Sequence, residues 1–228
     1  MTYIKVQGLM KSFGSKRILE YLDLEVDTPS IVAVIGNNGT GKSVFLNCLL
    51  NYMDADKGEI NLLGHSNKDQ IFVRKNTAFI SSDHQLHLEK LTPKEYFDLI
   101  ISIYDLQPEL GEEMYTKYMK ELNLIKDLQT SFKSLSFGSK KKVQLVGSLL
   151  FQPEVLVCDE IFEGLDFDAV EWVKQLFEER KMQGKVTLFT SHIIDYVKDI
   201  SDVIYILKEG KLVSPHQTTK REVDQYEV

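Results

Sequence analysis

A glycine-rich segment of the sequence has the residue types and spacing that bind a polyphosphate. It matches the pattern G-x-x-x-x-G-K-S and consists of Gly36, Asn37, Asn38, Gly39, Thr40, Gly41, Lys42 and Ser43. Glycines let backbone N–H groups turn toward phosphate oxygens, and the N-terminus of the helix that follows adds positive potential. We expect Lys42 to reach the β- and γ-phosphates and Ser43 to coordinate Mg²⁺. The segment predicts a nucleoside-triphosphate site, and alone it fits kinases, GTPases and motor ATPases equally well.

Two adjacent carboxylates end an apolar strand further along the chain. Val155–Cys158 is followed directly by Asp159 and Glu160. An acidic residue at the carboxyl end of a strand lies where α/β sheets bind ligands. We expect Asp159 to hold Mg²⁺, directly or through water, and Glu160 to orient and deprotonate an attacking water. Because acidic strand ends are often merely solvated, the phosphate segment is what makes this pair a candidate site.

These side chains can meet only if several strands end at a common edge. Short apolar runs rich in β-branched residues predict buried strands at Ile31–Ile35, Val155–Cys158, Val186–Thr190 and Val203–Leu207. Between them, Ala169–Met182 has apolar residues at helical spacing and predicts an amphipathic helix. This alternation predicts an α/β fold with a mostly parallel core sheet flanked by helices. With the phosphate segment, it predicts a P-loop NTPase.

The N-terminal region does not follow this alternation. Three segments joined by short Gly, Pro and Asp turns are predicted as strands, namely Tyr3–Leu9, Ile18–Val26 and Glu59–Leu63. We expect them to form an N-terminal antiparallel β layer that packs on the parallel sheet.

The middle of the chain predicts an inserted α-helical subdomain at about residues 86–150. Thr92 can cap a helix that begins with a proline, and a second helix is predicted at Glu112–Leu124. With this insertion, residues 1–213 are expected to form a single domain, followed by a polar C-terminal tail at residues 214–228.

Composition excludes several classes of protein. The 228 residues include 27 Lys and Arg against 34 Asp and Glu, and the net charge of −7 argues against a general nucleic-acid-binding surface. Cys48 and Cys158 lie in separate apolar segments, so no disulfide framework is predicted. No secretion signal is visible, and no apolar run approaches the roughly 20 residues that span a bilayer. We therefore expect no direct membrane insertion.

Residues 135–139, Leu-Ser-Phe-Gly-Ser, precede the carboxylate pair and resemble the LSGGQ signature of the ATP-binding cassette (ABC) ATPases. Ser136 and Gly138 match that motif, whereas Phe137 and Ser139 depart from it. In the family, this helix start contacts the γ-phosphate of a nucleotide held by the opposite subunit. The resemblance implies that role for Ser136 and Gly138, although either serine could also be a plain helix cap.

Three more residues fall in the order of the family's motifs. Asp166, in Gly-Leu-Asp at residues 164–166, resembles the D-loop aspartate, which implies a contact near nucleotide. His192 follows the strand at Val186–Thr190 and resembles the switch histidine, which reaches the γ-phosphate and the catalytic water. Phe13 has the place of the aromatic ring that stacks on adenine, although a ring there could also belong to the core or a hairpin.

The sequence departs from the family pattern after one predicted strand, and three lysines follow the signature segment. The family usually has a glutamine after the strand corresponding to Thr77–Ile80, and this glutamine approaches Mg²⁺ and couples the site to the membrane partner. Here Ser82 occupies the expected position and Gln85 follows three residues later. We expect Ser82 to ligate Mg²⁺ through its hydroxyl, with Gln85 as the alternative. The cations Lys140–Lys142, directly after the signature, are expected to form a solvated helix face, and a role near phosphate stays open as the alternative.

The resemblance, which covers residues 1–213, implies an ABC-type ATPase domain with ATP and Mg²⁺ as its ligands. Two copies would form a homodimer in the ATP-bound state, and hydrolysis would drive a separate integral membrane permease subunit. The implied location is cytoplasmic, peripheral on the inner face of the cell membrane, with no nucleic acid as partner. Among such systems we favour bacterial ABC-2 type exporters. Two alternatives stay open: a soluble ABC-type ATPase in DNA repair or translation, and a nucleotide-dependent regulatory module with little turnover.

Overall fold

A six-stranded sheet forms the centre of the computed structural model, which describes residues 2–83 and 86–213. Its strands lie in the order β10 (Lys211–Val213), β9 (Val203–Lys208), β3 (Ile31–Ile35), β8 (Val186–Thr190), β7 (Val155–Cys158) and β6 (Thr77–Ile80). Neighbouring strands pair in parallel, except for the antiparallel pair of β9 and β10 at one edge. The mostly parallel core sheet predicted from the alternation is confirmed.

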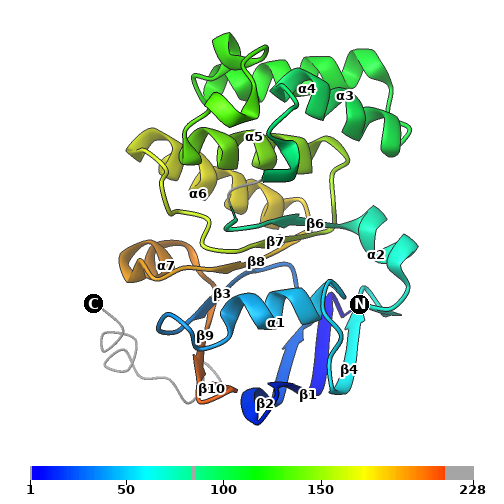
Figure 1. The fold of residues 1–228 in the computed structure, drawn as a ribbon, viewed down its shortest axis with the longest axis vertical. Coiled ribbons are helices and arrows are strands. Elements are labelled where there is room, and N and C mark those ends of the chain that lie inside the picture. Colours follow the sequence, from blue (N-terminus) through cyan, green and yellow to red (C-terminus); the bar gives the residue numbers. More distant parts are fainter. Residues whose placement is uncertain (1, 84–85, 214–228) are drawn as a thin grey trace.

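The strand β3 is apolar throughout because both of its faces are covered. On one face, Val32 and Val34 belong to the same core cluster as the buried side chains of α1 (Lys42–Leu49). On the other face, β3 packs with α6 (Phe167–Met182) and α7 (Ile194–Ile200). Figure 1 shows the two helices on the far side of the sheet from α1. A strand buried on both faces reads as a continuous hydrophobic run rather than as an alternation.

A second sheet packs against α1 at the bottom of Figure 1. Its strands are antiparallel and lie in the order β2 (Lys16–Val26), β1 (Ile4–Phe13), β4 (Lys57–Leu62) and β5 (His65–Ser66). A backbone hydrogen bond of 2.8 Å from Glu20 N–H to the carbonyl of Gly210 connects it to the turn between β9 and β10. The predicted N-terminal antiparallel layer is therefore confirmed.

Three helices lie together at the top of Figure 1, namely α3 (Pro93–Ile103), α4 (Pro108–Glu121) and α5 (Phe137–Leu150). They share a core in which the rings of Phe97 and Tyr115 stack with 4.8 Å between centroids. Leu145 and Leu149 of α5 belong instead to the core cluster against the parallel sheet. Because α5 contributes to both cores, it fixes this helical group to the sheet. The remaining short elements are α2 (Gln70–Asn76), η1 (Leu86–Leu88), η2 (Ile125–Asp127) and η3 (Phe132–Ser134).

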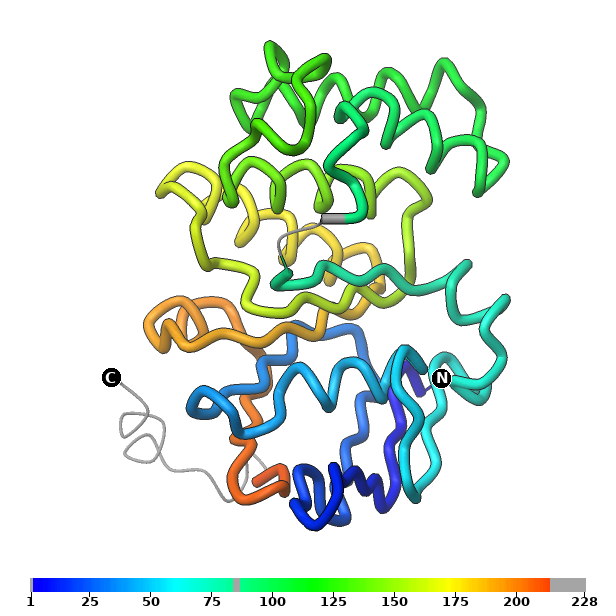
Figure 2. Tube along the Cα trace, viewed as in Figure 1, coloured from blue at the N-terminus to red at the C-terminus, as the bar shows by residue number. Residues whose placement is uncertain are grey.

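The helical group is inserted between β6 and β7, as the course of the chain in Figure 2 makes plain. The cap predicted for its first helix is present: Thr92 Oγ1 accepts from Glu95 N–H at 3.2 Å, and the carboxylate of Glu95 accepts from Thr92 N–H at 2.8 Å. The next helix was placed too late by the prediction, because it begins at Pro108 rather than Glu112. A proline suits a first helical turn, so Pro108 was the start signal that the apolar spacing did not show.

Within the described ranges, none of the helices has both the length and the apolar character needed to cross a membrane. Gln85 and the tail at residues 214–228 lie outside the described residues.

Candidate active site

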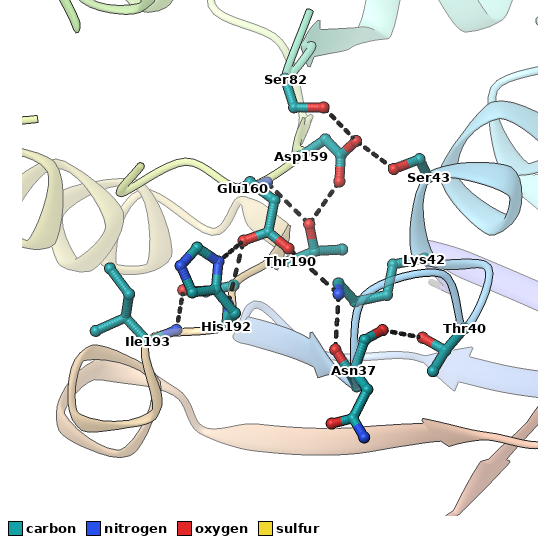
Figure 3. A network of polar contacts seen from close by, with 12 residues as sticks. Asn37, Thr40, Lys42, Ser43, Ser82, Asp159, Glu160, Thr190, His192 and Ile193 are labelled. Atoms are coloured by element: carbon teal, nitrogen blue, oxygen red, sulfur yellow. Dashed lines mark hydrogen bonds and ion pairs between the residues drawn. The ribbon is translucent and has the colours of Figure 1, made fainter. Parts of the chain in front are cut away.

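The glycine-rich segment forms the turn between β3 and α1 (Figure 3). Gly41 precedes the helix with a φ of 106°, and a Cβ there would lie 2.7 Å from Ile18 Cγ2. Only glycine fits both the left-handed backbone and the lack of space. Thr40 closes the turn, since its N–H and its hydroxyl both donate to the carbonyl of Asn37, at 3.3 and 2.9 Å. This turn leads into a helix N-terminus, whose first N–H groups have no partner within the helix and favour an anion.

Lys42 carries its ammonium into this turn and is only 6% exposed. Its Nζ donates to the carbonyl of Gly36 at 2.7 Å and lies 3.3 Å from Glu160 Oε1. A buried cation needs such partners, because leaving water without them is costly. The phosphate segment and the carboxylate pair thus meet through an ion pair, at the shared edge of the sheet.

Asp159 collects hydroxyl groups from three separate segments (Figure 3). Its Oδ2 accepts hydrogen bonds from Ser43 Oγ at 2.7 Å and from Ser82 Oγ at 2.9 Å. Its Oδ1 accepts from Thr190 Oγ1 at 2.7 Å, and the residue is 2% exposed. The sequence-predicted residues Ser43, Ser82 and Asp159 therefore lie together, as a group of oxygen atoms around a buried carboxylate.

Glu160 follows directly and points its carboxylate toward His192 (Figure 3). Its Oε2 lies 2.8 Å from His192 Nδ1 and accepts from His192 N–H at 3.1 Å. The backbone of Glu160 has a φ of 48°, a left-handed conformation that costs a residue with a side chain on the order of 1–3 kcal/mol. Such strain persists only where the surrounding structure holds the residue. The contacts of this loop therefore determine where the Glu160 carboxylate lies.

Thr190 is a site residue that the sequence reasoning missed. It is fully buried at the end of β8, and its hydroxyl accepts from Glu160 N–H at 2.9 Å while donating to Asp159. One side chain therefore orients both carboxylate residues. The available signal was its place at the carboxyl end of a predicted strand, the same edge on which Asp159 and Glu160 were expected.

The signature segment lies against the loop that follows Glu160. Ser136 caps α5, because its Oγ accepts from Ser139 N–H at 3.1 Å. A Cβ on Gly138 would lie 2.1 Å from the carbonyl oxygen of Gly164, so glycine is required for this contact. A Cβ on Gly164 would in turn lie 2.7 Å from Phe137 Cδ1. The ring of Phe137 thus packs against the loop that follows Glu160 in the same subunit.

The expectation of a solvated face at Lys140–Lys142 was wrong for two of its three lysines. Lys141 is 3% exposed and donates to the carbonyls of Glu160 and Glu163, and Lys142 is 8% exposed and pairs with Asp166 at 2.5 Å. A lysine stem can be buried when its ammonium finds acceptors at the far end. The partners lie on another loop, so the charge pattern along α5 could not show them.

Asp166 has two bonds that hold its carboxylate. The hydrogen bond from Lys142 lowers the pKa of this carboxyl, and the hydrogen bond that Ala169 N–H donates to it at 2.9 Å adds to the effect. The second bond makes Asp166 the N-cap of α6. Asp166 therefore links α5 to α6. Among the described residues, it takes no part in the hydrogen-bond network around Lys42.

Phe13 lies at the end of β1 and is 50% exposed. Lys11 Nζ lies 5.5 Å from the centre of its ring. The carboxylate of Asp56 accepts from Ser12 N–H at 2.7 Å, and this bond lowers the pKa of Asp56. The exposed half of the Phe13 ring is therefore available for stacking, and the hydrogen bond between Ser12 and Asp56 fixes the strand end that carries it.

Together these contacts bring the phosphate segment, Ser82, the carboxylate pair and His192 into one network, while Phe13 and Ser136 stand outside its hydrogen bonds among the described residues. A carboxylate beside an imidazole and an ammonium can accept a proton from water and can be held in the orientation that this requires. A buried carboxylate with hydroxyl oxygens around it suits a hard cation. The arrangement therefore fits the transfer of a phosphoryl group to water.

Comparison with known proteins gives a family match. A family model described as "ABC transporter" matches residues 19–163. The SkfA peptide export ATP-binding protein SkfE of Bacillus subtilis is 27% identical over 213 residues, which cover 93% of this chain and 88% of that protein. The methionine import ATP-binding protein MetN of Chlamydia felis is 30% identical over 220 residues, covering 92% and 64% respectively. A solved structure of an ATP-binding subunit of an ABC transporter superimposes with a TM-score of 0.86 at 29% identity, covering 92% of this chain and 88% of its own.

Proposed function

This chain belongs to the ABC transporter family of ATP-binding proteins, and we propose that it hydrolyses ATP as the energy-supplying subunit of a transporter. One observation carries the proposal: the two carboxylate oxygens of Glu160 contact Lys42 Nζ at 3.3 Å and His192 Nδ1 at 2.8 Å. This arrangement sets a candidate base beside the residue that the motif assigns to the γ-phosphate. The names of its relatives, which describe peptide export and methionine import, support a role in transport.

Each residue of the network has a part in the proposed reaction. Lys42 and the open helix N-terminus of α1 bind the phosphate oxygens of ATP. Glu160 orients the attacking water and takes its proton, and His192 holds Glu160 in place and reaches the γ-phosphate. Thr190 fixes the backbone of Glu160 and the carboxylate of Asp159 at the same time. Phe13 stacks on the adenine ring, as its exposed face allows.

The chemistry of the oxygen atoms around Asp159 fits Mg²⁺. This ion prefers carboxylate, hydroxyl and water oxygens, and three such protein groups converge here. Ser43, Ser82 and Asp159 would hold it, directly or through water. When bound, the ion neutralises negative charge on the phosphates.

The complete site is proposed to need a second copy of the chain. Ser136 and Gly138 stand outside the network around Lys42, at the start of α5. Ser136 is exposed there and available to a nucleotide held by another subunit, and the buried Gly138 packs beside it against Gly164. In the proposed cycle, two copies close on ATP and separate after hydrolysis. This movement drives a separate membrane permease subunit, so the protein works at the cytoplasmic face of the membrane. Its net charge of −7 argues against nucleic acid as the partner.

The test is the substitution Glu160→Gln, which keeps the shape of the side chain and removes its basicity. The purified wild type is expected to release phosphate from ATP in the presence of Mg²⁺. The variant should lose this turnover and should accumulate an ATP-bound dimer in size-exclusion chromatography.

Two results would count against the proposal. Unchanged hydrolysis by the Glu160→Gln variant would remove Glu160 as the base. A wild type that binds ATP and releases no phosphate, even with its membrane partner present, would favour a regulatory module with little turnover.

A further inference from the structure

Lys141, which begins the second turn of α5, is a buried cation that bridges to the loop after β7. Only 3% of its surface is exposed. Its Nζ donates hydrogen bonds to two backbone carbonyls, that of Glu160 at 2.6 Å and that of Glu163 at 2.9 Å. The ammonium also lies 4.7 Å from the centre of the Phe137 ring. Among the described residues, these contacts satisfy the cation without a direct ion pair to a carboxylate.

The two carbonyls belong to one tight turn. Glu163 N–H donates to the carbonyl of Glu160 at 3.2 Å, so that oxygen accepts from both the turn and the ammonium. Lys141 therefore bonds to the first and the last residue of the turn at once. Hydrogen bonds from a charged donor are stronger than those between neutral groups, so this bridge holds the turn firmly.

The turn begins with the strained residue of the site. The φ of 48° at Glu160 lies in the left-handed region, which a residue with a side chain adopts only where its surroundings hold it there. Thr190 holds the N–H of Glu160, and Lys141 holds its carbonyl. Both peptide groups that flank the Glu160 side chain are thus fixed.

We propose that Lys141 is a positioning residue, which holds the Glu160 backbone in its left-handed conformation and so directs the carboxylate toward Lys42 and His192. This inference rests on the proposed function, in which Glu160 is the base. The ammonium of Lys141 bonds to the backbone of the loop rather than to the Glu160 carboxylate. It acts only through the conformation of Glu160.

The same contact ties the signature segment to the base. Gly138 lies one turn before Lys141, and its Cα stands so near the carbonyl oxygen of Gly164 that a Cβ would reach within 2.1 Å. The start of α5 therefore touches the loop after Glu160 at two points. A displacement of this helix start would be passed to Glu160 through closely packed atoms, which deform little. Lys141 thus gives a second nucleotide, bound at the start of α5, a physical route to the base of this subunit.

The experiment compares Lys141→Met with Lys140→Met in the full-length protein. The first variant keeps an apolar stem and removes the ammonium, and the second removes a lysine one position earlier on the same helix. Steady-state phosphate release gives kcat, titration with the fluorescent analogue mant-ATP gives the dissociation constant, and thermal unfolding shows that each variant is folded. Glu160→Gln is measured beside them.

Lys141→Met is expected to lower kcat about tenfold or more, because small misplacements of a catalytic group are costly. Its affinity for mant-ATP should stay within about twofold of the wild type, since the phosphate segment is unchanged. Lys140→Met should change neither quantity by more than about twofold. If Lys141→Met does not fold, Lys141→Gln takes its place, with a shorter neutral donor and an expected loss in kcat of about threefold or more.

The outcomes separate this inference from the proposed function. Equal kcat values for the two methionine variants, with Glu160→Gln inactive, would overturn the positioning role and leave the function standing. A parallel loss of kcat and of mant-ATP affinity would show a general structural role for Lys141 and would also overturn it. Wild-type turnover by Glu160→Gln would instead remove Glu160 as the base, the part of the proposed function on which the inference rests.

Discussion

Ser82 and Asp159 are 77 residues apart in the chain, and Ser82 Oγ donates a hydrogen bond of 2.9 Å to Asp159 Oδ2. The register of two parallel strands brings them together, because Ile80 of β6 lies opposite Cys158 of β7. Asp159 N–H also donates to the carbonyl of Ile80 at 2.8 Å, which continues the pairing past the strand end. Ser82 therefore reaches the carboxylate although a serine is shorter than a glutamine.

The substitution Ser82→Ala tests whether this hydroxyl serves the metal. Removing one oxygen of the Mg²⁺ group should raise the Mg²⁺ concentration for half-maximal ATP hydrolysis about fivefold, the equivalent of about 1 kcal/mol. Nucleotide binding without Mg²⁺ should be unchanged, since Lys42 and the helix N-terminus are intact. Titration of Mg²⁺ at constant ATP measures the first effect, and titration with mant-ATP in the absence of Mg²⁺ measures the second. Ser82→Thr keeps a hydroxyl and should stay near the wild type, and an unaltered Mg²⁺ requirement in Ser82→Ala would exclude Ser82 as a ligand.

The ring of Phe13 is expected to contribute to ATP affinity rather than to turnover. Stacking of a base on an aromatic ring is worth about 1–3 kcal/mol, and the lower end applies to a ring that is 50% exposed. Phe13→Ala should therefore raise the dissociation constant for ATP about fivefold to tenfold at constant kcat. Phe13→Tyr keeps a stacking face and should bind like the wild type. If Phe13→Ala binds ATP as tightly as the wild type, Phe13 does not stack on adenine and serves only the structure at the end of β1.

The carboxylate of Asp166 should stabilise the fold in a pH-dependent way. The hydrogen bond from Lys142 lowers its pKa in the folded state, so its contribution is present above the unfolded value of about 3.9 and is lost as the pH falls through the lower, folded value. Asp166→Asn keeps an N-cap side chain and removes the charge. Because Asp166 is largely exposed, the variant should lose less than about 1 kcal/mol of unfolding free energy at pH 7.

Urea unfolding at several pH values measures this difference. The gap between the wild type and Asp166→Asn should be constant near neutrality and should narrow as the pH is lowered toward 3. A gap that keeps its full size in acid would mean that the loss comes from capping geometry and not from the charge pair with Lys142.

The parts of the site that sequence patterns could predict are those set by local rules. The phosphate segment needs glycines and a following helix, and Asp159 and Glu160 need only a strand that ends before them. The contacts of Thr190 and Lys141 follow another logic, because each depends on a loop that lies 19 to 31 residues away in the chain. Neither hydrophobic period nor charge pattern carries that information. Lys141 illustrates the limit, since three successive lysines are typical of a solvated surface and two of these are buried by acceptors on another element.

The close contact between Gly138 and Gly164 makes the last prediction, which concerns Gly138→Ala. Two effects oppose each other here. Alanine in place of glycine favours a helix by up to about 1 kcal/mol, and less in a first turn, where few helical bonds depend on it. The new Cβ would lie 2.1 Å from the carbonyl oxygen of Gly164, which is backbone and cannot rotate away.

The steric contact should outweigh the gain in helix propensity. To relieve it, the start of α5 must move away from the loop that follows Glu160, and strain of this kind costs about 1–3 kcal/mol. The expected net loss of about 1 kcal/mol corresponds to a fall of roughly 2–4 °C in the melting temperature for a chain of this size. Differential scanning calorimetry measures it, with Lys140→Ala as the control on the same helix. Since Lys141 would move together with the helix start, Gly138→Ala should also lower ATP turnover by more than Lys140→Ala does. A higher melting temperature in Gly138→Ala would mean that helix propensity prevails and that the two segments separate at little cost.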